Sequence, residues 1–172
     1  MRHEYCCEAK LDPTHVLALR IYTSSSYTCF NNHLRKNTKP HPFKMSVYYL
    51  NEAIKQLRSV GAEFPDYYEE VSFWRGMRDR TIMAEFKKKG GTEMAPMSTS
   101  RDKTVAFKYA ASGTPLVFHY KAIALQQGVS IEFLSLYPKE KEYLYPPLTY
   151  LSPLDHAEED GYQILIVRPQ MP

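Results

Sequence analysis

The sequence contains no long apolar run. No stretch approaches the roughly 20 consecutive apolar residues that a helix needs to cross a bilayer. The first residues, MRHEYCCEAKLDP, carry a basic side chain but no apolar core behind it, so they do not resemble a secretory signal. We therefore expect no membrane span and a cytoplasmic protein. A removed leader, secretion or a larger parent chain stays compatible with the sequence.

Cysteine is scarce as well. Cys6, Cys7 and Cys29 form an odd set, and adjacent cysteines rarely bond each other because the peptide between them must distort. We expect reduced thiols. A single bridge from Cys6 or Cys7 to Cys29, in an exported protein, is the alternative.

Common nucleotide and metal motifs are also missing. The sequence has neither GxGxxG nor GxxxxGK[ST], so any nucleotide must bind without these phosphate loops. Its six histidines show no HxxxH or Cys/His spacing, and we expect no metal. A net charge of +3 is too small to indicate nucleic acid as a partner.

What the chain does contain is typical of a globular protein. Its 172 residues are 44% apolar and 24% charged, which suits one domain with a substantial core. We expect a monomer with helices over residues 1–65 and a β-rich part over 66–172. The 14 tyrosines supply stacking faces and hydroxyl donors of the kind found in ligand clefts.

Helical patterns come first. Serines at 24–26 precede apolar residues at helical spacing, which predicts a helix that ends before Pro40. Ser46 is expected to cap a stronger helix that ends at Gly61. Residues 1–22 predict little beyond a turn at Asp12-Pro13.

Strand patterns follow, separated by turn signals and by two short helices, one over 79–91 and one from Ser100 to about Ala111. Helices first and strands later, with short connections, favour an α+β fold over a parallel doubly wound sheet. The expected strands cover 71–76, 93–100, 116–122, 129–137, 142–151 and 162–169.

Two carboxylates stand out in YPKEKEYLYPPLTYL, residues 137–151. In an extended segment Glu140 and Glu142 share one face, about 6.5 to 7 Å apart, while Lys141 points away. Both carboxylates should therefore reach one substrate. Two further candidates are Arg75-Gly76 and the hydroxyl triplet 98–100. Taken singly, these elements also fit a surface ion pair, a helix cap and a solvated acidic turn.

Taken in order, Arg75-Gly76, Ser98-Thr99-Ser100 and Glu140-Lys141-Glu142 before YLYPP resemble the mono-ADP-ribosyltransferases of the arginine, serine, ExE class. FNNHLRK and LNEAIKQL resemble that family's helices, so the resemblance covers roughly residues 22–169. It implies N-terminal helices followed by a mainly antiparallel β core of two sheets around an NAD cleft.

The resemblance also implies a reaction. The enzyme would cleave NAD at the nicotinamide bond and pass ADP-ribose to an acceptor protein, with an arginine side chain expected. Glu142 would stabilise the cationic ribosyl transition state, as carboxylates do in glycosidases. Glu140 would orient the acceptor and draw a proton from it, and Tyr137 would touch the acceptor.

The same resemblance gives roles to the other motifs. Arg75 would hold the pyrophosphate or ribose of NAD with its guanidinium fork, and Ser98 would orient Glu142. The expected catalytic residues are thus Glu142, Glu140, Ser98 and Arg75. The expected NAD contacts are Arg75, Gly76, Ser98, Thr99, Ser100 and Glu142. Thr99 would support its strand and Ser100 would cap the next helix.

Two other functions fit the same motifs. One is an NAD glycohydrolase, in which water replaces the acceptor at the same site. The other is an inactive module that binds NAD or a protein. Lys141, between the two glutamates, departs from many relatives and is expected to affect acceptor preference.

Overall fold

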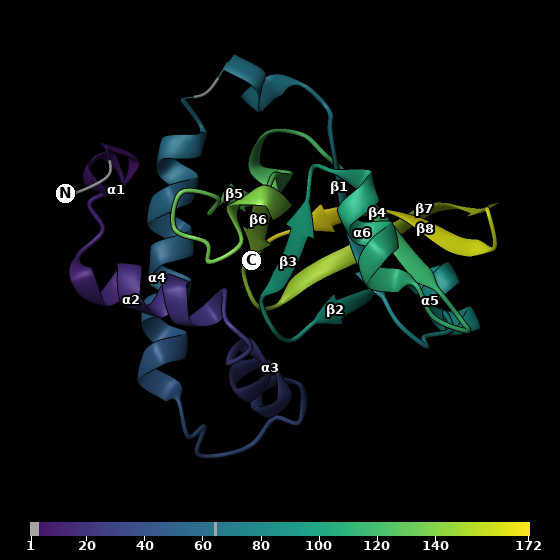
Figure 1. Ribbon diagram of the computed structural model, residues 1–172, viewed down its shortest axis with the longest axis horizontal. Helices are drawn as coiled ribbons and strands as arrows, with labels where there is room; N and C mark the ends of the chain where they lie inside the picture. Colours follow the sequence, from purple (N-terminus) through teal and green to yellow (C-terminus); the bar gives the residue numbers. More distant parts are fainter. Residues whose placement is uncertain (1–3, 64) are drawn as a thin grey trace.

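The computed structural model describes residues 4–63 and 65–172 and confirms the α+β fold. The helices of the first third lie together on one side of the sheet, as Figure 1 shows. Within the described part of the chain, no helix is long and apolar enough to span a membrane. These helices are α1 (Glu4–Glu8), α2 (Pro13–Tyr22), α3 (Tyr27–Arg35) and α4 (Lys44–Gly61), followed by the short 3₁₀ helix η1 (Pro65–Tyr68).

Helix α2 begins where only a turn was expected. Asp12 caps it, because its Oδ1 accepts hydrogen bonds from the backbone N–H groups of Thr14 (2.8 Å) and His15 (3.0 Å). Pro13 occupies the first helical position, where its missing N–H costs nothing. The Asp-Pro pair was therefore a helix start, and α2 places Tyr22 at its last position.

Helix α4 starts earlier than Ser46 predicts. Phe43 is at the cap position, and Ser46 lies inside the first turn. The predicted end at Gly61 is correct. One face of α4 is fully buried, with Leu50, Ile54 and Leu57 nearly inaccessible to solvent. Burying each such side chain stabilises the fold by about 1.5 to 3 kcal/mol.

Hydrogen bonds join all described strands into one eight-stranded sheet, in the order β2-β7-β8-β4-β1-β3-β6-β5. The expected separation into two sheets is thus not seen in the strand pairing. Every pairing is antiparallel except β4 with β8. The strands are β1 (Val71–Met77), β2 (Gly91–Glu93), β3 (Met97–Ser100), β4 (Leu116–Ala122), β5 (Val129–Ser130), β6 (Glu142–Tyr145), β7 (Thr149–Glu159) and β8 (Tyr162–Gln170).

Several strand predictions need correction. The expected strand 129–137 forms pairs only over β5, because the chain then turns, with the Leu134 and Ser135 N–H groups both donating to the Ile131 carbonyl. Residues 93–100 split into β2 and β3 around Pro96, which has no N–H for a ladder. Residues 142–151 split into β6 and β7 in the same way, at the two prolines.

The remaining helices are α5 (Ala84–Lys89) and α6 (Lys103–Ala110), with the 3₁₀ turns η2 (Ala124–Gln126) and η3 (Pro138–Glu140). Helix α6 lies against β1 at Gly76, which is inside the strand and not its end. A Cβ atom on Gly76 would stand 1.9 Å from the Ala106 carbonyl oxygen. Only glycine therefore allows α6 to pack so close to the strand that carries Arg75.

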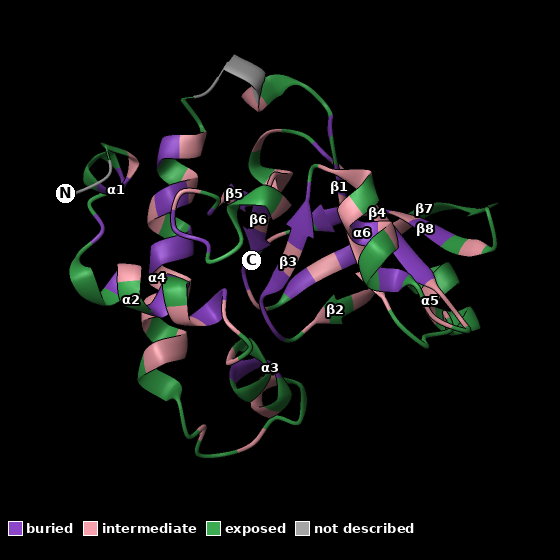
Figure 2. Cartoon of the chain, viewed as in Figure 1, coloured by how far each residue is buried: buried purple, intermediate pink, exposed green. Residues whose placement is uncertain are grey.

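The core divides between the two halves of the molecule. One cluster of buried residues joins Leu19, Ile54 and Leu57 of the helices to Ile131 and Leu144. A second cluster, around Phe73, is formed mainly by side chains of the strands. Buried residues follow the inward face of α4 and the central strands (Figure 2). Strands β3 and β6 lie between these clusters, and the candidate site is built there.

Candidate functional site

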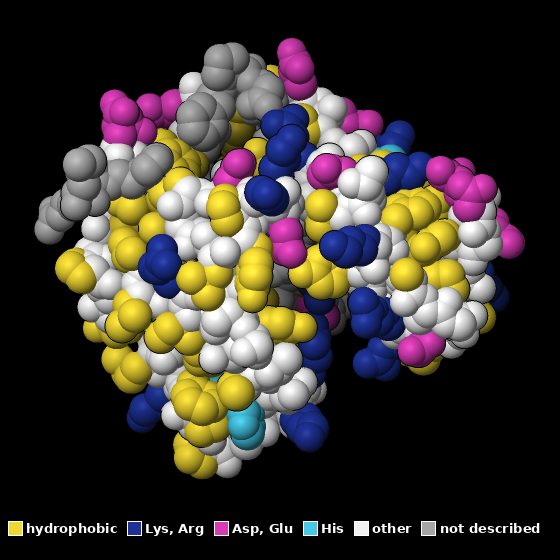
Figure 3. All heavy atoms as spheres, in the orientation of Figure 1, with side chains coloured by type: hydrophobic (Ala, Val, Ile, Leu, Met, Phe, Trp, Pro, Cys, Tyr) yellow, Lys and Arg dark blue, Asp and Glu magenta, His cyan; other side chains and the backbone are white. Residues whose placement is uncertain are grey.

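A pocket of about 340 Å³ lies between the helical part and the sheet. This volume is in the range of small-molecule sites. Basic side chains gather along the hollow between the two parts in the space-filling view (Figure 3). All predicted site residues line the pocket: Arg75 and Gly76 from β1, Ser98, Thr99 and Ser100 from β3, Tyr137 and Glu140 from the η3 segment, and Glu142 from β6.

The ladder between β3 and β6 fixes Glu142. Ser100 is paired with Glu142, and Ser98 with Leu144. The Thr99 hydroxyl adds a hydrogen bond to the Tyr143 carbonyl at 3.0 Å. Because the ladder sets the register, the first residue of β6 faces the pocket and Glu142 cannot shift along the strand.

Glu142 is a buried carboxylate, with 8% of its surface exposed. Burial raises its pKa, the hydrogen bonds from Ser98 and Ser135 oppose that rise, and the nearby Glu140 adds to it. The Ser135 hydroxyl lies 3.2 Å from Glu142 Oε2. A negative charge held here is poorly screened by water and acts strongly on any cation beside it.

Glu140 does not share a strand face with Glu142. It ends the 3₁₀ turn η3, and Lys141 adopts the left-handed conformation with φ 46°. The extended geometry expected for residues 140–142 is therefore wrong. The turn still leaves both carboxylates on the same pocket, while Lys141 is exposed.

Two hydroxyl groups hold Glu140. The Ser100 hydroxyl donates to its main-chain carbonyl at 2.6 Å, and the Tyr109 hydroxyl of α6 donates to its side-chain Oε1 at 2.7 Å. Ser100 is thus not the cap of α6 as expected. Asp102 takes that place, because its Oδ1 accepts from the Thr104 N–H at 2.9 Å.

Arg75 has an open donor. Its Nη1 is buried and finds no hydrogen-bond partner among residues 4–63 and 65–172. Leaving a buried guanidinium N–H unpaired is costly, so the pocket suits a ligand with anionic oxygens. A pyrophosphate meets that requirement, and the described residues therefore fit NAD at this point.

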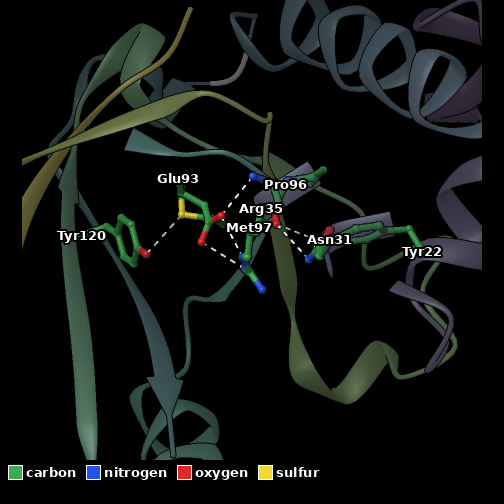
Figure 4. Close-up of polar contacts among 8 residues, drawn as sticks. Tyr22, Asn31, Arg35, Glu93, Pro96, Met97 and Tyr120 are labelled. Carbon is green, nitrogen blue, oxygen red and sulfur yellow. Dashed lines mark hydrogen bonds and ion pairs between the residues drawn. The ribbon is translucent and has the colours of Figure 1, made fainter. Parts of the chain in front are cut away.

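The helical side of the pocket contributes residues that the sequence did not suggest. Tyr22 and Asn31 are buried, and both point toward the Pro96 carbonyl in Figure 4. The Tyr22 hydroxyl donates to Pro96 O at 2.8 Å, and Asn31 Nδ2 donates to Tyr22 Oη at 3.1 Å. Burial raises the pKa of Tyr22 to about 12, so it remains a donor.

A second link joins the helices to the sheet nearby. Arg35 of α3 makes two hydrogen bonds with Glu93 of β2, at 2.9 and 3.0 Å, also seen in Figure 4. Asn31 and Arg35 are four residues apart, on one face of α3. This polar pair at helical spacing, next to the apolar Phe30, was the sequence signal that could have predicted a polar contact of α3. Tyr22 had none, because its acceptor, the Pro96 carbonyl, lies 74 positions away in the chain.

Comparison with known proteins identifies the family of the chain. A family model described as NAD:arginine ADP-ribosyltransferase matches residues 2–170. A search of curated protein sequences found no match.

Solved structures show the same fold. The ADP-ribosyltransferase HopU1 of Pseudomonas syringae pv. tomato DC3000 is 20% identical with a TM-score of 0.77, over 98% of this chain and 83% of that one. Vis toxin from Vibrio splendidus is 17% identical with a TM-score of 0.70, over 95% and 76%. The eukaryotic mono-ADP-ribosyltransferase ART2.2 is 23% identical with a TM-score of 0.68, over 94% and 68%. With the family model covering nearly its whole length, the chain belongs to the NAD:arginine ADP-ribosyltransferase family.

Proposed function

We propose that this protein transfers a single ADP-ribose group from NAD to an arginine side chain of an acceptor protein and releases nicotinamide. One observation carries the proposal: the buried carboxylate of Glu142 and the unpartnered N–H of Arg75 line one pocket. The first suits a developing cation, and the second suits a pyrophosphate.

Glu142 acts on the bond that breaks. When the bond between the ribose C1′ and the nicotinamide nitrogen breaks, its electron pair goes to the pyridinium nitrogen and nicotinamide leaves neutral. Positive charge then develops on the ribose, as in the oxocarbenium-like transition states of glycosidases. The Glu142 carboxylate stabilises that charge, and the Ser98 and Ser135 hydroxyls keep the carboxylate in place.

The residues of β1 and β3 bind and align NAD. Arg75 donates to its pyrophosphate or ribose, and Gly76 lines the pocket beside it. Ser98, Thr99 and Ser100 follow along the pocket wall, where Ser98 orients Glu142. One solved structure of a related enzyme, exoenzyme S from Pseudomonas aeruginosa, contains bound carba-NAD. That complex supports NAD as the co-substrate here.

Glu140 and Tyr137 receive the acceptor. Both lie at the exposed side of the pocket, and Tyr137 is 57% exposed. A carboxylate pairs well with the planar guanidinium, and it can take the proton that the attacking nitrogen gives up. One structure of the related enzyme Vis holds agmatine, a compound with a guanidine group, which supports arginine as the acceptor type.

NAD glycohydrolase activity is the second candidate. The exposure of Tyr137, and of half the Tyr109 side chain, leaves the acceptor side of the pocket open to water. Water would then attack the same ribose carbon, with Glu142 in the same role. Glu140 would be dispensable in that reaction.

The experiment is incubation of the protein with NAD, with and without agmatine. Nicotinamide release together with ADP-ribosylated agmatine is expected. Free ADP-ribose as the only product, even at high agmatine concentration, would favour the glycohydrolase. No nicotinamide release under either condition would contradict both activities and leave an inactive binding module.

A further inference from the structure

Tyr109 spans the exposed side of the pocket. It comes from α6, while its partner Glu140 comes from η3, and the hydroxyl lies 2.7 Å from Glu140 Oε1. The main chain of Glu140 is held separately, by the Ser100 hydroxyl. Glu140 is thus held at two points: Ser100 binds its main-chain carbonyl and Tyr109 binds its side-chain carboxylate.

The helix that carries Tyr109 is held firmly against the sheet. Helix α6 is capped by Asp102 and packs against β1 at Gly76, where backbone meets backbone. Ala106 and Ala110 of the same helix are buried. A side chain on such a helix is better placed to orient a partner than one on a loop. Glu140, by contrast, lies in a short turn followed by the left-handed Lys141.

The hydroxyl remains a donor throughout the ordinary pH range. The hydrogen bond to Glu140, followed by burial, raises the pKa of Tyr109 to about 12. This bond goes to Oε1 of the carboxylate and leaves Oε2 available for an incoming guanidinium. Without Tyr109, the Glu140 side chain could rotate among several rotamers and meet the acceptor in fewer of them.

We propose that Tyr109 is a positioning residue that holds the Glu140 carboxylate ready for a guanidine acceptor and so favours transfer over hydrolysis. The inference rests on the proposed function. It concerns the acceptor step alone, because Tyr109 acts through Glu140 and not through the Glu142 carboxylate that serves NAD cleavage.

The test is Tyr109→Phe, which removes one oxygen atom and keeps the ring. We expect the transfer rate to agmatine at low agmatine concentration to fall about five- to tenfold, the size of one charge-assisted hydrogen bond at a half-exposed site. The KM for agmatine should rise, while the KM for NAD and the rate of hydrolysis without agmatine stay within about twofold.

Matched control variants show whether the effect of Tyr109→Phe is specific to its contact with Glu140. Tyr48→Phe alters a tyrosine of similar exposure on α4, outside the pocket lining, and should change none of these values. Glu140→Ala and the double variant complete a cycle: once Glu140 is removed, loss of the Tyr109 hydroxyl should have no further effect on transfer. Thermal unfolding of each variant checks that it is folded.

Three outcomes overturn the inference. The first is an unchanged KM for agmatine in Tyr109→Phe, and the second is an equal fall in hydrolysis and transfer, which would mean that Tyr109 acts on NAD. The third is a full effect of Tyr109→Phe in the Glu140→Ala background. Failure of the wild-type protein to release nicotinamide is a different result, because it would contradict the proposed function itself.

Discussion

The two sides of the pocket are built differently. The inner wall, formed by Tyr22, Asn31 and Glu142, is buried and is joined by hydrogen bonds and strand pairing between distant parts of the chain. The outer rim, formed by Tyr109, Tyr137 and Glu140, is partly exposed, and one side-chain hydrogen bond joins Tyr109 to Glu140 at a turn. The inner wall is therefore shielded from solvent and tied to the fold, whereas the outer rim is accessible.

This difference matches the two halves of the proposed reaction. Breaking the bond to nicotinamide needs a charge that water does not screen, which only the inner wall offers. Receiving a side chain from another protein needs access from solvent, which only the outer rim offers. We infer that changes in the inner wall affect both products, and that changes in the outer rim affect mainly the choice of acceptor.

The largest effect is expected from Glu142→Gln, which keeps the shape but removes the charge of the inner wall. NAD cleavage should fall about a hundredfold, or ~3 kcal/mol of transition-state stabilisation, both with and without agmatine. Nicotinamide release measures it. Glu132→Gln, at an exposed position in the preceding loop, is the control. Unchanged turnover in Glu142→Gln would mean that the proposed mechanism is wrong.

A smaller effect is expected from Tyr22→Phe, which leaves the buried Pro96 carbonyl and the Asn31 amide with fewer partners. The free energy of unfolding should fall by about 1 to 3 kcal/mol, as measured by urea denaturation. NAD cleavage and transfer to agmatine should fall together, because Pro96 precedes the strand that carries Ser98. A selective loss of transfer would erase the distinction between inner wall and outer rim.

A graded effect is expected from pH. Burial holds the pKa of Glu142 above its ordinary value, and the catalytic form is the ionised one. NAD cleavage should therefore rise as pH rises through this raised pKa, and drop about tenfold for each pH unit below it. A pH profile of nicotinamide release measures it. A profile with no ionisation above the ordinary range of a glutamate would contradict the role of burial.

Stability should follow the opposite course. Because the folded state binds the Glu142 proton more tightly than the unfolded state, this group's stabilising contribution is complete below its ordinary pKa. It is lost as pH rises through the raised one. Urea denaturation across this window should show less decline for Glu142→Gln than for the wild type.

The resemblance of three motifs to a known family predicted residues that the structure brings together in one pocket. Arg75, Ser98 and Glu142 each lie on a short strand whose pattern is visible locally, and their strands bring them to one pocket. The local path at Glu140 was missed, because a period-two pattern does not reveal that Lys141 adopts a left-handed conformation. A single non-glycine residue in that conformation depends on its surroundings more than on its own preference.

Long-range partners were missed for a different reason. Tyr22 lies 74 positions from Pro96, and Tyr109 lies 31 positions from Glu140, so no local pattern relates either pair. The early helix α2 was missed because its cap, Asp12-Pro13, has the same composition as a turn. In the sheet, the predicted strand 129–137 was too long. The apolar residues after β5 lie in a turn and pack into the core of the helical part, so their spacing does not indicate a strand.

The pairing of Ser100 with Glu142 has an evolutionary consequence. Since the ladder between β3 and β6 anchors Glu142, residues of the turn 137–141 can be exchanged without moving its carboxylate, as long as Ser135 keeps its hydrogen bond to that group. That turn, to which we assign the acceptor, is thus free to diverge. Descendants of such a chain could adopt new target proteins step by step while inheriting an unaltered way of breaking the dinucleotide.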